Sequence, residues 1–185
     1  MDRKLLNTEL GRLTKEEYLS TQNDKLVLLL DNVRSAHNVG SAFRSADCFK
    51  VGRVVLCGIS PVPPSALIHK TALGAESVVP FEYFKDSLEA ARKLKDEGYV
   101  LVAVEQTCNS VSLENFEADF ARQKYAFILG NEVDGVQQEL VDLCDYSLEI
   151  PQFGTKHSLN VSVATGIVLW HTFGRYLAEH SKSEE

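Results

Sequence analysis

The sequence lacks the features that mark exported, membrane-spanning and zinc-binding chains. Its 185 residues include four cysteines, which are isolated from one another, with no C-x-x-C pair and no histidine at a zinc-finger spacing. The longest apolar run, near residues 26–30, is far shorter than a bilayer needs, and the first residues carry no export signal. We therefore expect a cytoplasmic protein without a membrane segment or metal site, whose cysteines are reduced and serve in packing.

The sequence also has no excess of basic residues. Its formal charge is −7 and its isoelectric point is near 5.3, whereas nucleic-acid-binding domains are usually basic overall. A nucleic-acid partner would therefore have to be held by local groups of positive charge.

Four apolar runs mark a central sheet. They lie at residues 25–30, 54–57, 99–104 and 125–129, and their continuous apolar character is typical of strands buried on both faces of a parallel sheet. Helical patterns at residues 38–49, 87–97, 136–143 and 158–177 alternate with them. The alternation and the length predict one α/β domain, with a mostly parallel sheet flanked by helices.

Residues 1–24 precede the first predicted strand and carry two short helical patterns, at residues 5–10 and after Thr14. Thr14 and Glu17 have the spacing of a capping box, which favours a helix start there. We expect residues 1–24 to form a helical arm on a domain that occupies residues 25–185.

A first candidate site follows the first predicted strand. Residues 32–44 include Arg34, His37, Asn38, Gly40 and Arg44. Ligands of open α/β sheets bind beyond the carboxyl ends of the strands, so the position is favourable. The same residues have a plain structural interpretation, in which Asn38 caps a helix, Gly40 permits close packing and Arg44 is a solvated surface residue.

A second candidate site is the turn after the run at residues 125–129, which contains Gly130, Asn131, Glu132 and Gly135. Glycines there let a ligand approach the main chain. The spacing fits neither the phosphate-binding G-x-x-x-x-G-K-[ST] pattern nor G-x-G-x-x-G. An ordinary strand-to-helix turn is the competing interpretation.

A third candidate site runs from Ile150 into the last predicted helix and includes Lys156, Ser158 and Asn160. Ser158 is the predicted cap of that helix and Asn160 would lie in its first turn, so neither residue by itself requires a functional explanation. All three polar segments are expected to follow buried strands, however, and the sheet can gather them at one edge.

Together the three segments resemble the SPOUT superfamily of methyltransferases, in particular its RNA ribose 2′-O-methyltransferase branch. The resemblance covers roughly residues 26–170. It is carried by Asn38 with Arg44, by the Leu-Gly-Asn-Glu run at 129–132 with Gly135, and by Ile-Pro at 150–151 with Ser-Leu-Asn-Val-Ser-Val-Ala at 158–164. It implies an α/β fold with a C-terminal trefoil knot, in which S-adenosylmethionine is bound.

The resemblance also implies roles for individual residues. The cofactor would be held largely by main-chain groups, at Val104, Gln106, Leu129, Gly130, Ile150 and Leu159. Methyl transfer to a ribose hydroxyl would depend on Arg44, with Asn38, Glu132, Ser158 and Asn160 positioning Arg44 and the substrate. Because a guanidinium is effectively always protonated, we favour an anchoring and electrostatic role for Arg44 over proton abstraction.

The implied substrate is RNA, either tRNA or rRNA. Arg34, His37 and Lys156 are the candidate RNA-binding residues, although Arg34 and Lys156 are also ordinary surface charges. The resemblance further implies a homodimer, which would bring two such surfaces together.

Two other functions are considered. The chain could be a non-catalytic RNA-binding or assembly module that retains the methyltransferase fold, but the polar residues of all three segments are present. It could also be a nucleotide-binding enzyme of the doubly wound type, but no glycine fingerprint follows residues 25–30.

Overall fold

The computed structural model describes residues 2–11, 13–21 and 24–180. It contains a seven-stranded sheet of order β3-β2-β1-β6-β4-β7-β5, with parallel pairing throughout. The strands are β1 (Leu26–Asp31), β2 (Arg53–Cys57), β3 (Phe81–Phe84), β4 (Tyr99–Val104), β5 (Val111–Ser112), β6 (Lys124–Leu129) and β7 (Tyr146–Glu149). The helices are α1 (Lys15–Ser20), α2 (Ala36–Cys48), α3 (Ala66–Ala72), α4 (Ser87–Asp96), α5 (Gln138–Leu143), α6 (Val161–Leu169) and α7 (Arg175–His180). Short 3-10 helices lie at Asn7–Glu9, Ala75–Ser77 and Leu113–Asn115, and a π-helical turn spans Trp170–Gly174.

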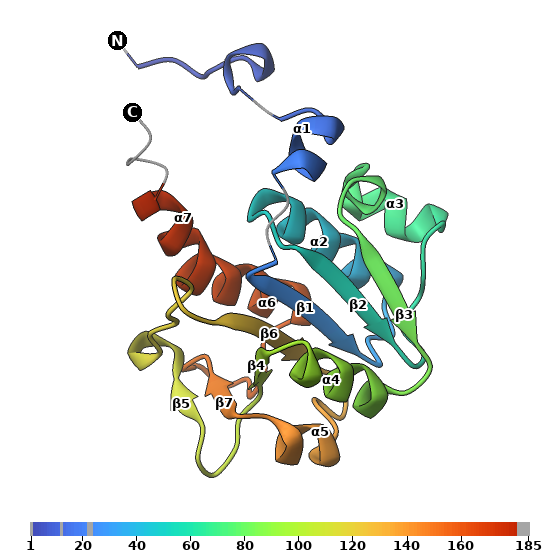
Figure 1. The fold of residues 1–185 in the computed structure, drawn as a ribbon, viewed down its shortest axis with the longest axis vertical. Helices are drawn as coiled ribbons and strands as arrows, with labels where there is room; N and C mark the ends of the chain where they lie inside the picture. Colours follow the sequence, from blue (N-terminus) through green and yellow to red (C-terminus); the bar gives the residue numbers. More distant parts are fainter. Residues whose placement is uncertain (1, 12, 22–23, 181–185) are drawn as a thin grey trace.

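The sheet is covered by helices on both faces (Figure 1). Side chains alternate between faces along a strand, and in β1 Leu28 packs into one buried cluster while Leu29 packs into the other. The first cluster includes residues of α2, α3 and α6, and the second includes residues of α4 and α5. Burial on both faces explains why the central strands have continuous apolar runs.

The predicted α/β class and parallel sheet are confirmed. The four predicted strands correspond to β1, β2, β4 and β6, which occupy four of the five inner positions of the sheet. The sequence analysis missed β3, β5, β7 and α3. β3 is an edge strand with half-buried or exposed residues, and β5 has only two residues, so neither carries a continuous apolar run.

Gly40 brings α2 close to α3. A Cβ atom at Gly40 would lie 2.2 Å from Thr71 Oγ1 and 2.3 Å from the carbonyl oxygen of Ile68. The Thr71 hydroxyl also donates a 2.9 Å hydrogen bond to the carbonyl of His37. The predicted role of Gly40 in close helix packing is confirmed, and the contact fixes the first turn of α2 on α3.

The predicted C-terminal helix differs in two respects. It begins at Val161 rather than at residue 158, and the π-helical turn at Trp170–Gly174 separates α6 from α7. Three apolar residues spaced three or four positions apart form a stripe along this helix, and they are exposed, with 49% of Val163, 36% of Ile167 and 61% of Trp170 accessible to solvent. The stripe therefore lies on the surface of the single chain rather than in its core.

The segment before β1 contains a 3-10 helix and α1. The predicted capping box of Thr14 and Glu17 is present. The segment contacts the domain through Tyr18, which is buried and donates a 3.1 Å hydrogen bond to the carbonyl of Val51. Within the described ranges, no helix is both long and apolar enough to cross a membrane.

The four cysteines are free. Cys57 is buried and Cys144 is half-buried, as expected for packing residues. Cys48 and Cys108 are exposed, so the predicted packing role is wrong for these two.

Candidate functional site

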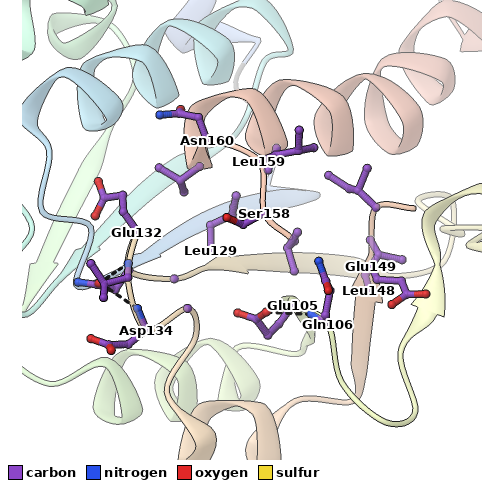
Figure 2. Close-up of a pocket in the computed structure, with 18 of the residues that line it drawn as sticks. Glu105, Gln106, Leu129, Glu132, Asp134, Leu148, Glu149, Ser158, Leu159 and Asn160 are labelled. Atoms are coloured by element: carbon purple, nitrogen blue, oxygen red, sulfur yellow. Dashed lines mark hydrogen bonds between the residues drawn. The ribbon is translucent and has the colours of Figure 1, made fainter. Parts of the chain in front are cut away.

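A cavity of about 460 Å³ lies where the chain leaves β4, β6 and β7 (Figure 2). Its volume is within the range of small-molecule sites, and it lies at the carboxyl edge of the parallel sheet, where ligands of such sheets bind. Its lining comes from three stretches of chain, namely residues 104–106, residues 129–135 and selected residues between 148 and 164. Two of the three candidate segments thus meet around one cavity.

The six predicted cofactor-binding residues all line this cavity. They are Val104, Gln106, Leu129, Gly130, Ile150 and Leu159. Three of the predicted catalytic residues, Glu132, Ser158 and Asn160, line it as well.

Gly130 and Gly135 determine the shape of the turn after β6. The two residues at its ends, Asn131 and Gly135, exchange backbone hydrogen bonds of 2.9 and 3.0 Å. A Cβ atom at Gly130 would lie 2.1 to 2.3 Å from backbone atoms of Gly135 and Val136, and Gly135 has a φ of 71°. Only glycine fits this turn at both positions without strain.

Glu132 connects this turn to the segment after β1. One carboxylate oxygen accepts a 2.9 Å hydrogen bond from the backbone N–H of Arg34. The other accepts hydrogen bonds of 3.0 Å from the backbone N–H of Ser35 and 2.8 Å from Nδ2 of Asn38. Burial by itself raises the pKa of Glu132, but the hydrogen bonds from these three residues outweigh it and hold the pKa below its usual value.

Asn160 connects α6 to the same network. Its Nδ2 donates a 3.2 Å hydrogen bond to Oδ1 of Asn38, and its Oδ1 accepts from the backbone N–H of Ser162 at 2.9 Å. Asn160 is therefore the N-cap of α6, and the predicted cap at Ser158 is wrong. The alternative in which Asn38 caps α2 is also wrong, because Ser35 caps that helix and leaves Asn38 free to bind Glu132 and Asn160.

The first candidate segment contributes no lining residue and is connected to the cavity by hydrogen bonds to residues that line it. Asn38 is not among the lining residues, but it binds two residues that are. The four predicted cationic residues, Arg34, His37, Arg44 and Lys156, are exposed and do not line the cavity. Arg44 lies on α2, and its side chain makes no hydrogen bond or ion pair with any described residue.

The sequence analysis missed several acidic residues at the cavity. Glu105, Asp134 and Glu149 line it together with Glu132, and among the described residues no lysine, arginine or histidine does so. Glu105 and Glu149 lie at strand ends, where a single carboxylate gives no pattern that distinguishes it from a surface charge. Their common position at the carboxyl edge of the sheet was the only available signal.

Gln106 closes one side of the cavity. Its Nε2 donates a 2.9 Å hydrogen bond to the carbonyl of His157. This bond joins the end of β4 to the loop that leads to α6. Gln106, which is predicted to hold the cofactor, therefore also has a structural function.

Comparison with known proteins places the chain in a family. The model of the SpoU rRNA Methylase family matches residues 25–170. The 23S rRNA (guanosine-2′-O-)-methyltransferase RlmB of Nitrosomonas europaea is 36% identical over 155 residues, which are 82% of this chain and 56% of that protein. RlmB of Vibrio vulnificus is 31% identical over 163 residues, which are 88% of this chain and 64% of that protein.

Solved structures show the same fold. The TrmH/SpoU tRNA modifying enzyme of A. aeolicus has a TM-score of 0.78 and 26% identity, over 90% of this chain and 82% of that one. The AdoMet-bound rRNA methyltransferase of Sinorhizobium meliloti has a TM-score of 0.76 and 28% identity, over 84% of this chain and 58% of that one. This chain spans 56% and 64% of the two curated RlmB relatives. The match over residues 25–170 and the shared fold show that the chain belongs to the SpoU rRNA methylase family.

Proposed function

We propose that this protein transfers a methyl group from S-adenosylmethionine to a ribose 2′-hydroxyl of tRNA or rRNA. The observation that carries the proposal is the cavity at the carboxyl ends of β4, β6 and β7, which is lined by all six residues expected to hold the donor. The relatives support it, because RlmB is named as a guanosine-2′-O-methyltransferase and the S. meliloti relative was solved with AdoMet bound.

The cavity suits this donor in size and in chemistry. Leu129, Ile150 and Leu159 offer apolar surface for an adenine ring, and the turn at Gly130 keeps side chains away from the main chain that would bind it. The donor carries a positive sulfonium, which the acidic lining of the cavity would favour. When bound, the donor supplies an activated methyl group.

The reaction joins the ribose 2′-oxygen to the methyl carbon as the carbon–sulfur bond breaks, which leaves S-adenosylhomocysteine, and the hydroxyl proton passes to solvent water. The two reacting atoms must be held in line. Asn38, Glu132, Ser158 and Asn160 are proposed to position the ribose. Glu132 is a poor proton acceptor, because its carboxylate already accepts three hydrogen bonds and its pKa is lowered.

Arg44 is proposed to anchor an RNA phosphate rather than to accept the proton. Guanidinium groups are planar donors that match phosphate oxygens, and the Arg44 side chain is exposed and makes no hydrogen bond or ion pair with the described residues. Arg34, His37 and Lys156 are proposed to contribute further phosphate contacts. Local cations of this kind would offset the net charge of −7.

We propose a homodimer in which the apolar stripe of α6 is covered by a second copy of the chain. Val163, Ile167 and Trp170 lie three or four residues apart along α6 and the turn after it, and all are exposed. A contiguous exposed apolar surface of this kind commonly marks an interface. A dimer would also double the number of cations available to RNA.

Three further expectations are proposed, of which the first rests on the family relationship. They are a trefoil knot formed by the C-terminal part of the chain, a cytoplasmic location, and an arm at residues 1–24 that helps to hold RNA. Deletion of residues 1–24 is expected to weaken RNA binding and to leave donor binding unchanged.

Donor binding provides the first test. Isothermal titration of the purified protein with S-adenosylmethionine is expected to show one site per chain. Gly130→Ala should abolish binding, because the added Cβ would overlap backbone atoms of Gly135 and Val136. Gly154→Ala is the matched control, since a Cβ there meets nothing within 4 Å. Absence of binding to the unaltered protein would refute the proposed function.

A further inference from the structure

Two consecutive backbone amides after the turn at residues 130–135 are held by carboxylates from two different strands. The N–H of Val136 donates to Oε2 of Glu105 at 3.0 Å. The N–H of Gln137 donates to Oδ2 of Asp31 at 3.1 Å. Asp31 ends β1, and Glu105 directly follows β4, and these strands flank β6 on its two sides. The segment that leaves β6 is thus fastened from both neighbouring strands.

Asp31 is fully buried, and its carboxylate has hydrogen bonds on both oxygens. Besides the backbone of Gln137, it accepts from Nε2 of Gln137 at 2.7 Å, from the hydroxyl of Ser87 at 2.6 Å and from Nδ2 of Asn32 at 2.8 Å. A buried carboxylate is costly unless it is hydrogen-bonded in this way. Apart from the neighbouring Asn32, its donors come from two distant segments, at Ser87 and Gln137, so Asp31 fixes their relative positions.

Glu105 fastens the same segment at the wall of the cavity. Its Oε1 accepts a 2.9 Å hydrogen bond from the backbone N–H of Gln106. Its Oε2 lies 2.2 Å from the place where a Cβ of residue 135 would stand, so the glycine at 135 makes room for the carboxylate. Figure 2 shows Glu105 beside Gln106 at the wall of the cavity.

We propose that Asp31 and Glu105 are positioning residues that hold residues 130–137 in the conformation required for donor binding. The proposal rests on the proposed function and adds two residues to it. Residues 129–135 supply about a third of the residues that line the cavity, and their main chain is expected to contact the donor. A segment that is already ordered loses less conformational entropy when the ligand binds.

The test uses Glu105→Gln and Asp31→Asn, which preserve size and remove the charge that the amides bind. Each variant is expected to raise the dissociation constant for S-adenosylmethionine about tenfold, which corresponds to about 1.4 kcal/mol. Hydrogen exchange of the backbone amides of residues 136 and 137 should become faster in the same variants. The double variant should lose less than the product of the two single effects, because either change alone frees the same segment.

Two variants serve as matched controls. Glu149→Gln removes another carboxylate of the cavity wall, whose described side-chain bond is to the hydroxyl of Ser110 and not to residues 130–137. Ser87→Ala removes a bond to Asp31 on the side of α4 and leaves both bonds to Gln137. Both controls should keep the exchange rates of residues 136 and 137, and Ser87→Ala should bind the donor within about threefold of the unaltered protein.

The possible outcomes separate this proposal from the proposed function. One outcome is that the unaltered protein binds the donor while Glu105→Gln shows unchanged donor binding and unchanged amide exchange. This result would overturn the positioning role of Asp31 and Glu105 and leave the proposed function standing. Equally fast exchange at residues 136 and 137 in Glu149→Gln would also overturn that role, because the effect would then be one of charge in the cavity. If Asp31→Asn fails to fold, Glu105→Gln still decides the matter through exchange at residue 136.

Discussion

Asn160 donates a 3.2 Å hydrogen bond from its Nδ2 to Oδ1 of Asn38, across 122 positions of the chain. The bond connects the first turn of α2 to the N-cap of α6. Because Asn38 also binds Glu132, the three polar segments are joined in one network at the carboxyl edge of the sheet.

Asn160 has two functions that substitution can separate. Asn160→Ala removes both the helix cap and the bond to Asn38, and is expected to lower the free energy of unfolding by about 1 kcal/mol. Asn160→Ser keeps a good capping oxygen and should change stability much less. Both variants should lose most methyl transfer. Denaturant unfolding measures the effect on stability, and a methyl-transfer assay measures the effect on activity. Full activity of Asn160→Ser would show that methyl transfer does not need the bond to Asn38.

The lowered pKa of Glu132 predicts a pH-dependent contribution to stability. Since the pKa is lower in the folded than in the unfolded chain, the contribution is present above the unfolded value, about 4.3, and is lost as the pH falls through the folded value. The free energy of unfolding should therefore be higher for the unaltered protein than for Glu132→Gln at neutral pH. The difference between the two free energies should shrink in acid. A difference that is independent of pH would contradict this interpretation.

The exposed stripe of α6 predicts a dimer that a single charge disrupts. Val163→Glu should yield a folded monomer, because a carboxylate would be buried without a partner at the proposed interface. Leu67→Glu is the control, since Leu67 is 55% exposed on α3, away from that stripe. Sedimentation velocity measures both. A monomeric unaltered protein, or a dimeric Val163→Glu variant, would refute the proposed interface.

Arg44→Ala is expected to abolish methyl transfer and to leave the dissociation constant for S-adenosylmethionine unchanged. The reason is that Arg44 lies outside the cavity and is proposed to contact phosphate. The slope of RNA affinity against salt concentration should fall by about one. Arg92→Ala, a change to an exposed arginine of α4, controls for net charge and should keep activity. Retained activity of Arg44→Ala would exclude Arg44 from the mechanism.

The core of the fold could be predicted from the sequence because its strands are buried on both faces. Residues 26–31 are all buried, and such a run leaves a clear apolar pattern. β3 could not be predicted, because half of its residues are exposed at the edge of the sheet. The exposed stripe of α6 has the same periodicity as a core-facing stripe, so periodicity alone could not show which surface it faces.

The candidate site could be predicted only in part. The six residues expected to hold the donor all line one cavity, because the strand ends determine their positions. The caps at Ser35 and Asn160 were misplaced by a few residues, since Ser and Asn cap about equally well and the choice depends on where the backbone turns. Asp31 and Glu105 were missed because their partners are backbone amides distant in sequence, and sequence patterns do not reveal such bonds.

The most direct test of the central claim is to identify the nucleoside that receives the methyl group. RNA lacking modifications is incubated with the protein and S-adenosylmethionine carrying a deuterated methyl group, then digested to nucleosides and analysed by mass spectrometry. We expect the label on the ribose of a single type of nucleoside, as a 2′-O-methyl group. Label on a base would contradict this proposal. RNA that binds but stays unlabelled would also contradict it, and would indicate a non-catalytic RNA-binding module.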